Sequence, residues 1–309
     1  MKDINFGTFP TMITPYHDDN TVDYEAVKNI TNWYIANGCT GIFAVCQSSE
    51  MVYLSLEEKV KIAKTVVETV KASGKDVSVV ASGHNSDDMD AQVRELTAIA
   101  ETGVDAIVWV SNRLDLHNDG DEVWIKNAEK LLSQLPEDIA IGIYECPYPY
   151  KRLLTKEILD WCISTGRFTF IKDTCCDPDE LDRRLEQIKG TSIKLYNANS
   201  QTLLYTLRNG GAGFSGIMAN FHPDLYAWLC ENYDKDDRRV QSVQNFLCLC
   251  AFLEVLAYPQ TAKYHMNKVG VPMSLWSRSC DHKKFTKYQR MIIDDIMTAE
   301  EDIRELIRK

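Results

Sequence analysis

A lysine and a tyrosine stand where two apolar segments of the chain end. The segment FTFI at 168–171 is β-branched or aromatic throughout, which is typical of a buried strand, and Lys172 follows it directly. Earlier in the chain, Tyr144 ends the apolar run IAIGIY. A neutral lysine amine can attack a ketone and form a Schiff base, and a phenol can relay the protons of that reaction. This pair of residue types indicates chemistry on a carbonyl compound.

The same two residues also have structural interpretations. A lysine after a strand often begins a solvated loop, and Tyr144 could be a core tyrosine whose hydroxyl is hydrogen-bonded. Catalysis requires the two side chains to meet. Neighbouring strands lie about 4.8 Å apart, so hydrogen-bonding distance is within reach if both side chains point inward. We then expect the apolar residues before Lys172 to desolvate its amine and to lower its pKa.

Strand-like and helix-like patterns alternate from residue 7 to about residue 232. An initial strand near 8–15 is followed by apolar segments, each separated from the next by a helical pattern, at 41–46, 77–82, 105–110, 139–144, 168–172, 192–197 and 211–218. Continuous apolar strands with helices between them indicate a parallel sheet that is covered on its outside. Eight strand–helix units predict an α/β fold, a (β/α)8 TIM barrel over 1–232, and the helical pattern of 233–309 predicts an appended C-terminal helical module.

Three local signals support this division into elements. Ser55 and Glu58 form a capping box at the start of the second helix, and Gly103 is the expected C-cap of the helix over 89–103. Pro178 begins the helix expected over 178–188. No glycine-rich phosphate loop follows the first strand, so a dinucleotide-binding fold finds no support.

The carboxyl ends of the barrel strands form the active site in this fold class, so the residues there are the candidates. Ser48, in the CQSSE segment at 46–50, is a small hydroxyl that could orient the proton relay, and Ser215 stands near the end of the last strand. We interpret Glu50 as a buried carboxylate that ties loops together and His84 as a support of the loop after the third strand. The thiols of 175–176 are interpreted as structural.

Composition excludes several classes of partner and cofactor. The net charge is −11, with 45 acidic and 34 basic residues, which argues against a nucleic-acid footprint and against binding to an anionic membrane surface. No apolar run reaches about 18 residues, so no membrane span is expected. The beginning MKDINFGTFP has no apolar signal segment, and ten cysteines without a CxxC pair suggest reduced thiols, so we expect a cytoplasmic protein. Six scattered histidines without HExxH predict no metal.

At these strand ends the chain resembles the family of dihydrodipicolinate synthase and N-acetylneuraminate lyase, over essentially its whole length. TPY at 14–16 resembles the end of the family's first strand, and CQSSE resembles its G-[ST]-T-G-E loop. YECP at 144–147 resembles Y-N-x-P, IKD at 171–173 resembles I-K-[DE], and GGAGFSGIMAN at 210–220 resembles the glycine-rich eighth strand.

The resemblance implies a role for each candidate residue. Lys172 would form a Schiff base with pyruvate or another 2-oxo acid, and Tyr144 would shuttle protons. Gln47 and Ser48 take the positions of the two loop residues that hold the substrate carboxylate. The protonated imine is itself the electron sink, so no cofactor is implied. The resemblance also implies a homo-tetramer whose assembly the C-terminal helices assist.

The chain departs from the family pattern at the residues that would read a second substrate. Both loop glycines are replaced, by Cys46 and Ser49. After the fourth strand the synthases carry a tyrosine where this chain has Arg113 and Leu114, and the arginine after their Y-N-x-P motif is here Pro149. Two cations remain as candidates for a distal anionic or hydroxylated part of the substrate, namely Arg113 and Lys151.

We therefore predict a class I, lysine Schiff-base aldolase or lyase that acts on pyruvate or a related 2-oxo acid. The reaction would be carbon–carbon cleavage or condensation, or dehydration of a keto-sugar acid. Two alternatives stay open. One is a dihydrodipicolinate (4-hydroxy-tetrahydrodipicolinate) synthase with a rewired site, and the other is a non-catalytic family member that binds a 2-oxo acid.

Overall fold

Eight parallel strands form one sheet that closes into a barrel. The computed structural model describes residues 3–308. The strands lie in the order β1-β8-β7-β6-β5-β4-β3-β2. A parallel bridge joins Thr11, after β1, to Phe43 at the end of β2, and the Met12 N–H donates to the Phe43 carbonyl oxygen at 3.0 Å. The strands are β1 Gly7–Thr8, β2 Gly41–Phe43, β3 Ser78–Ala81, β4 Ala106–Val110, β5 Ala140–Tyr144, β6 Phe168–Asp173, β7 Lys194–Asn197 and β8 Gly213–Phe214.

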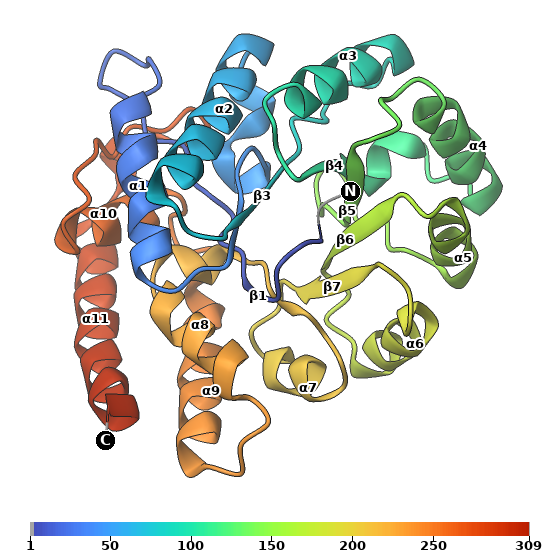
Figure 1. Ribbon diagram of the computed structural model, residues 1–309. Helices are drawn as coiled ribbons and strands as arrows, with labels where there is room; N and C mark the ends of the chain where they lie inside the picture. The colour runs from blue at the N-terminus through green and yellow to red at the C-terminus, as the bar shows by residue number, and fades with distance from the viewer. Residues whose placement is uncertain (1–2, 309) are drawn as a thin grey trace.

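Helices surround the strands, one after each strand, so the expectation of a (β/α)8 TIM barrel is confirmed (Figure 1). The helices of the barrel are α1 Tyr24–Ala36, α2 Leu56–Ser73, α3 Met89–Ala100, α4 Asp121–Leu132, α5 Lys156–Thr165, α6 Pro178–Ile188, α7 Leu203–Arg208 and α8 Pro223–Asn232. Three further helices lie on one side of the barrel, near α1 and α8 in Figure 1. They are α9 Arg238–Cys250, α10 Gln260–Lys268 and α11 Lys287–Arg308.

Element boundaries mostly follow the sequence signals, but β8, expected over 211–218, spans only Gly213–Phe214. The Ser55–Glu58 capping box and the helix at 178–188 are confirmed. The first two strands are shorter than expected, because the chain leaves β2 after Phe43 and soon turns into the 3-10 helix η1, Gln47–Ser49. The prediction of Gly103 as a C-cap was wrong. Helix α3 is capped at Glu101, and Gly103 closes a further turn in which its N–H donates to Ala100.

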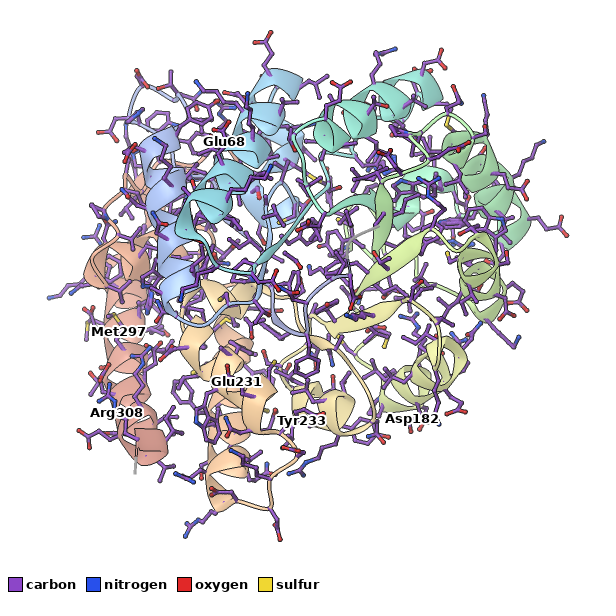
Figure 2. All side chains as sticks on the ribbon, in the orientation of Figure 1. Glu68, Asp182, Glu231, Tyr233, Met297 and Arg308 are labelled. Atoms are coloured by element: carbon purple, nitrogen blue, oxygen red, sulfur yellow. The ribbon has the colours of Figure 1, made fainter. Side chains whose placement is uncertain are left out.

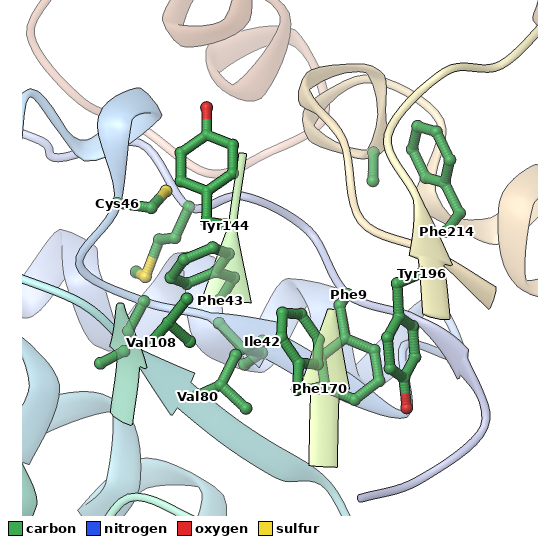
Figure 3. Packing of buried hydrophobic residues seen from close by; sticks show 14 of the residues in the cluster. Phe9, Ile42, Phe43, Cys46, Val80, Val108, Tyr144, Phe170, Tyr196 and Phe214 are labelled. Atoms are coloured by element: carbon green, nitrogen blue, oxygen red, sulfur yellow. The ribbon is translucent and has the colours of Figure 1, made fainter. Parts of the chain in front are cut away.

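The barrel interior below the carboxyl ends is filled by an aromatic layer (Figure 3). The ring of Phe9 lies 4.6 Å from that of Tyr196 and 5.6 Å from that of Phe170, and Phe43 lies 6.0 Å from Phe170, centroid to centroid. Gly41 makes room for this layer, since a Cβ at its position would stand 2.0 Å from the Phe9 ring. All four rings are fully buried, so the layer is an apolar environment, and such an environment favours the neutral form of an amine above it.

Glu50 connects the barrel to the segment that precedes α11, as interpreted from the sequence. It lies after η1 in the left-handed region, at φ 59°. Its carboxylate accepts hydrogen bonds from the Ser277 hydroxyl at 2.7 Å and from the backbone N–H groups of Arg278 at 2.8 Å and Ser279 at 2.7 Å. The buried ammonium of Lys263 lies 3.9 Å from the same carboxylate. The interpretation of Glu50 as a tie between loops is confirmed.

His84 supports the loop after β3, also as interpreted. Its Nδ1 accepts a hydrogen bond from the Val110 N–H at 3.0 Å, and its Nε2 lies 2.9 Å from the Gln92 Oε1 atom. Complete burial lowers the pKa of the imidazole to about 4, so the ring is neutral and its Nε2–H is the donor to Gln92. The ring therefore links β4 to α3 rather than facing the barrel interior.

Charged side chains gather at the outer faces of the helices, as Figure 2 shows for Asp182 on α6 and Arg308 at the end of α11. In residues 3–308, no helix combines the length and the apolar character of a membrane span.

We expect Glu50→Ala to destabilise the protein by about 3–5 kcal/mol, because it leaves the buried Lys263 ammonium without its counter-charge and two part-buried backbone N–H groups without their acceptor. Urea unfolding measures the loss, and hydrogen exchange at the Ser279 amide reports the local opening. Glu68→Ala, at an exposed position on α2, is the matched control and should change stability by less than about 1 kcal/mol. Equal losses in the two variants would contradict the role assigned to Glu50.

Candidate active site

Lys172 and Tyr144 meet at the carboxyl end of the barrel. They are register partners on β6 and β5, and both side chains are buried. The Lys172 Nζ atom lies 3.9 Å from the centroid of the Tyr144 ring. In residues 3–308 no hydrogen bond joins the amine to the phenol oxygen, so the contact is with the face of the ring rather than with its hydroxyl. Both residues line a cavity of about 270 Å³.

Burial lowers the pKa of Lys172. Thiolates of Cys46 and Cys146 would oppose this effect, but burial raises the pKa of both thiols, so they stay neutral near pH 7. The remaining anion that acts on the amine is Glu254. The face of the Tyr144 ring also favours the charged amine, whereas desolvation by burial disfavours it. A lysine in this state gives up its proton, and becomes a nucleophile, more readily than an exposed one.

Tyr144 stays protonated, because burial raises the pKa of its phenol well above the ordinary value. Figure 3 shows its hydroxyl pointing away from the aromatic layer, whereas the hydroxyl of Tyr196 points the opposite way. The Tyr144 ring packs edge-on against Phe43, with centroids 5.9 Å apart. The phenol is therefore a fixed donor at the cavity end of the barrel.

A buried ion cluster fixes the ends of β5 and β6 from outside the barrel. The residues that follow the pair are Glu145 and Asp173, and both bind the guanidinium of Arg184 on α6, at 2.8 Å in the case of Glu145. All three side chains are fully buried. Successive residues of a strand point to opposite faces, so the carboxylates face α6 while the tyrosine and the lysine face the cavity. Sequence reasoning missed this cluster.

Gln47 and Ser48 lie at the same end of the barrel, beside the cavity rather than among the residues that line it. The Ser48 hydroxyl donates to the Thr11 Oγ1 atom at 3.1 Å and also forms a side-chain hydrogen bond with Tyr258. The Gln47 Oε1 atom lies 3.8 Å from the Cys146 sulfur. Among residues 3–308, no group accepts a hydrogen bond from the Gln47 side-chain amide nitrogen.

The two cations named from the sequence differ in position. Lys151 lines the cavity, and its Nζ donates to the Thr174 carbonyl oxygen at 2.7 Å. Arg113 does not line it and forms an ion pair with Asp87 at 2.5 Å. Ser215 is fully buried next to the lining residue Gly216, and its hydroxyl has no partner in the described part of the chain.

Other residues complete the cavity wall without having been named as candidates from the sequence. They are Pro147, Thr174, Cys176, Ala198, Asn199, Gly216, Ile217 and Glu254. Glu254 comes from outside the barrel, directly after the 3-10 helix η5, Ala251–Leu253. The one sequence signal that pointed to it is a single acid in the apolar stretch AFLEVLA. Among the described residues no group of three His, Cys, Asp or Glu side chains has the arrangement of a metal site.

Comparison with known sequences identifies proteins that are similar to this chain. The sequence model of the Dihydrodipicolinate synthetase family matches residues 5–121. A protein of Clostridium perfringens (strain SM101 / Type A) named 4-hydroxy-tetrahydrodipicolinate synthase is 25% identical over 276 residues, which cover 87% of this chain and 91% of the relative. A protein of the same name from Ralstonia nicotianae is 26% identical over 229 residues, 72% of this chain and 73% of the relative.

Solved structures share the fold at lower identity. YagE from E. coli, a prophage protein of the dihydrodipicolinic acid synthase family solved in complex with pyruvate, superposes with a TM-score of 0.83 at 18% identity and covers 97% of this chain and 98% of its own. A monomeric dihydrodipicolinate synthase variant gives a TM-score of 0.84 at 16% identity, with coverage of 96% and 97%.

We expect Arg184→Met to destabilise the protein by about 3–5 kcal/mol, since it leaves the carboxylates of Glu145 and Asp173 buried next to each other without a cation. Urea unfolding measures this loss. Arg183→Met on the same helix removes a half-buried guanidinium and should cost about 1 kcal/mol or less. Combining Arg184→Met with Glu145→Gln and Asp173→Asn should recover part of the loss; a triple variant less stable than Arg184→Met would contradict charge repulsion as its cause.

Proposed function

We propose that the protein is a member of the dihydrodipicolinate synthetase family, whose sequence model matches residues 5–121, and that it is a class I aldolase or lyase that forms a Schiff base between Lys172 and pyruvate or a related 2-oxo acid. The observation that carries the proposal is the buried amine of Lys172 in a cavity that it shares with the Tyr144 phenol. The proposed chemistry needs an amine that loses its proton readily next to a proton donor, and burial lowers the pKa of Lys172 and raises the pKa of the Tyr144 phenol.

Imine formation begins when the Lys172 nitrogen attacks the C2 carbonyl carbon of the 2-oxo acid. The carbonyl oxygen takes up a proton, which the Tyr144 phenol delivers, and the nitrogen loses one. The resulting hydroxyl takes up a second proton, which solvent supplies, and leaves as water, so that a protonated C=N bond remains. Tyr144 regains its proton from the attacking nitrogen, so it ends the step as it began.

The protonated imine then draws electrons away from C3. Loss of a proton at C3 gives an enamine, which attacks an aldehyde carbon and forms a carbon–carbon bond; the reverse sequence cleaves that bond. A hydroxyl group on the carbon next to the enamine leaves as water instead, which is a dehydration. The same lysine therefore supports condensation, cleavage and dehydration, and the cavity wall beyond it decides among them.

We assign the carboxylate of the 2-oxo acid to the loop that carries Gln47 and Ser48. The side-chain amide of Gln47 is a donor of suitable type, and the Ser48 hydroxyl can turn from Thr11 toward an anion. The bulk of Gln47 places the carboxylate farther from the backbone than a small hydroxyl residue would. Ser215, with its unpartnered hydroxyl behind Gly216, and Lys151 at the rim are the further substrate-binding candidates.

A second candidate function is 4-hydroxy-tetrahydrodipicolinate synthesis, which the names of the curated relatives favour. The nearest arginine after the YECP motif is Arg152, and its guanidinium is bound by Asp121 at 2.6 Å and Asp115 at 3.5 Å. A guanidinium held by two carboxylates is a weak receptor for the carboxylate of a second substrate. For this reason we rank an aldolase or lyase with another acceptor above the synthase.

We expect borohydride with pyruvate to leave a reduced adduct on Lys172, because reduction of the imine makes the bond permanent. Peptide mass spectrometry locates the adduct. Lys263 is the internal control, since burial lowers its pKa to about 8 but it does not line the cavity, so it should carry no adduct. Lys172→Arg keeps the charge and should remove the adduct.

An adduct on Lys263 or Lys151, or no adduct on a folded protein, would falsify the assignment of Lys172. Given an adduct, product formation separates the remaining candidates. Condensation of pyruvate with aspartate semialdehyde identifies the synthase, and turnover of other aldehydes or keto-sugar acids identifies the aldolase or lyase. An adduct without turnover of any of these substrates indicates a non-catalytic binder.

We also propose that the protein is a cytoplasmic homo-tetramer, from the family resemblance. A monomeric synthase variant of the same fold shows that a single chain of this kind can fold alone. Sedimentation equilibrium on the purified protein should give about four times the chain mass of 35.2 kDa. A concentration-independent monomer would overturn the proposed assembly.

A further inference from the structure

Glu254 brings a carboxylate into the candidate active site from outside the barrel. It follows η5 and lines the same cavity as Lys172 and Tyr144. Among the described residues that line the cavity it is the one carboxylate. Burial raises its pKa, and the positive charge of Lys172 acts against that increase.

In the segment 252–255, two apolar side chains are exposed and the acid lines the cavity, which is the opposite of what burial of apolar surface favours. The neighbours Phe252 and Val255 are 70% and 79% exposed, while the acid between them turns into the cavity. A soluble segment normally exposes the acid and buries the two apolar side chains. Local departures of this kind are expected at functional or strained positions.

No partner among the described residues explains why this carboxylate lines the cavity. Other buried carboxylates are bound: Glu145 by Arg184, Glu300 by His222 at 2.8 Å, and Glu50 by backbone N–H groups. In residues 3–308, by contrast, no hydrogen bond or direct ion pair involves the side chain of Glu254. Glu254 and Lys172 line the same cavity and act on each other through their charges, so the carboxylate is available to a ligand that binds there.

We propose that Glu254 contacts the part of the substrate beyond the imine carbon, and that it favours the binding of a hydroxyl group there over a second carboxylate. This inference rests on the proposed function. A carboxylate accepts strong hydrogen bonds from a hydroxyl group and repels another carboxylate, and both effects are larger in a small cavity than in water. The preferred substrate is then a hydroxylated 2-oxo acid, or pyruvate with a hydroxylated aldehyde.

Lys151 would attract a second carboxylate on the substrate and so oppose the repulsion by Glu254. Its ammonium lies at the rim, is exposed, and already donates to the Thr174 carbonyl oxygen. Solvent and salt screen an exposed charge more than a half-buried one. We therefore expect Glu254 rather than Lys151 to decide the selection, and the test below includes both.

The experiment measures imine formation with three 2-oxo acids of equal chain length. They are 2-oxopentanoate, which ends in a methyl group, 5-hydroxy-2-oxopentanoate, and 2-oxoglutarate, which ends in a carboxylate. For each acid, borohydride trapping on the full-length protein gives the concentration at which half of Lys172 carries the adduct. We expect this concentration to be lowest for the hydroxyl compound and at least about tenfold higher for 2-oxoglutarate.

Glu254→Gln keeps the shape and removes the charge, so it should bring 2-oxoglutarate to within about threefold of 2-oxopentanoate. Glu254→Ala should also remove the preference for the hydroxyl compound. Glu231→Gln, on the exposed end of α8, changes the net charge equally and should leave all three values as in the wild type. Lys151→Ala should change the three values by less than Glu254→Gln does.

A second readout does not depend on the distal group. Removing the Glu254 charge takes away an anion that favours protonated Lys172, so Glu254→Gln should move the pH profile of trapping with pyruvate toward lower pH. Glu231→Gln should leave the profile in place.

The outcomes separate this inference from the proposed function. If the wild type forms no adduct with pyruvate, the proposed function fails and this inference fails with it. If the pyruvate adduct forms but the discrimination against 2-oxoglutarate is absent, is unchanged in Glu254→Gln, or disappears in Lys151→Ala instead, the imine chemistry stands and the role of Glu254 is overturned.

Discussion

The ion cluster of Arg184 with Glu145 and Asp173 is the constraint on which the candidate site depends. Three charges without solvent are tolerated only because each finds its partner, so α6 and the ends of β5 and β6 have one arrangement that satisfies all of them. The strand period of two then turns Tyr144 and Lys172 to the opposite face. The position of the amine over the tyrosine ring is thus fixed from outside the barrel, by residues that never touch the cavity.

The barrel interior supplies the second condition, which is an apolar layer below the lysine. The rings of Phe9, Phe43, Phe170 and Tyr196 fill the space below the carboxyl ends of the strands. Desolvation by burial lowers the pKa of Lys172, and the face of the tyrosine ring acts in the opposite direction. The lowered pKa of the lysine at this position is therefore a consequence of packing as much as of the residue itself.

The helices after residue 232 contribute to the site rather than only covering the barrel. The loop after β2 is held to them by Glu50, through Ser277 and two backbone amides. Tyr258 reaches Ser48, and Glu254 enters the cavity wall. The open mouth of a barrel offers few contacts of its own, so a segment that closes over it acquires influence on what binds there.

By itself the sequence determined the barrel and the pair at its centre. The alternation of apolar strands and amphipathic helices is local and periodic, and a lysine and a tyrosine that end adjacent parallel strands must share one end of the barrel. Only the tertiary structure decided that Arg113 is paired with Asp87 away from the cavity, that Arg184 fixes the two strands, and that Glu254 faces Lys172. These are contacts between segments far apart in the chain, and residue type and spacing do not specify which distant charge a buried charge will meet.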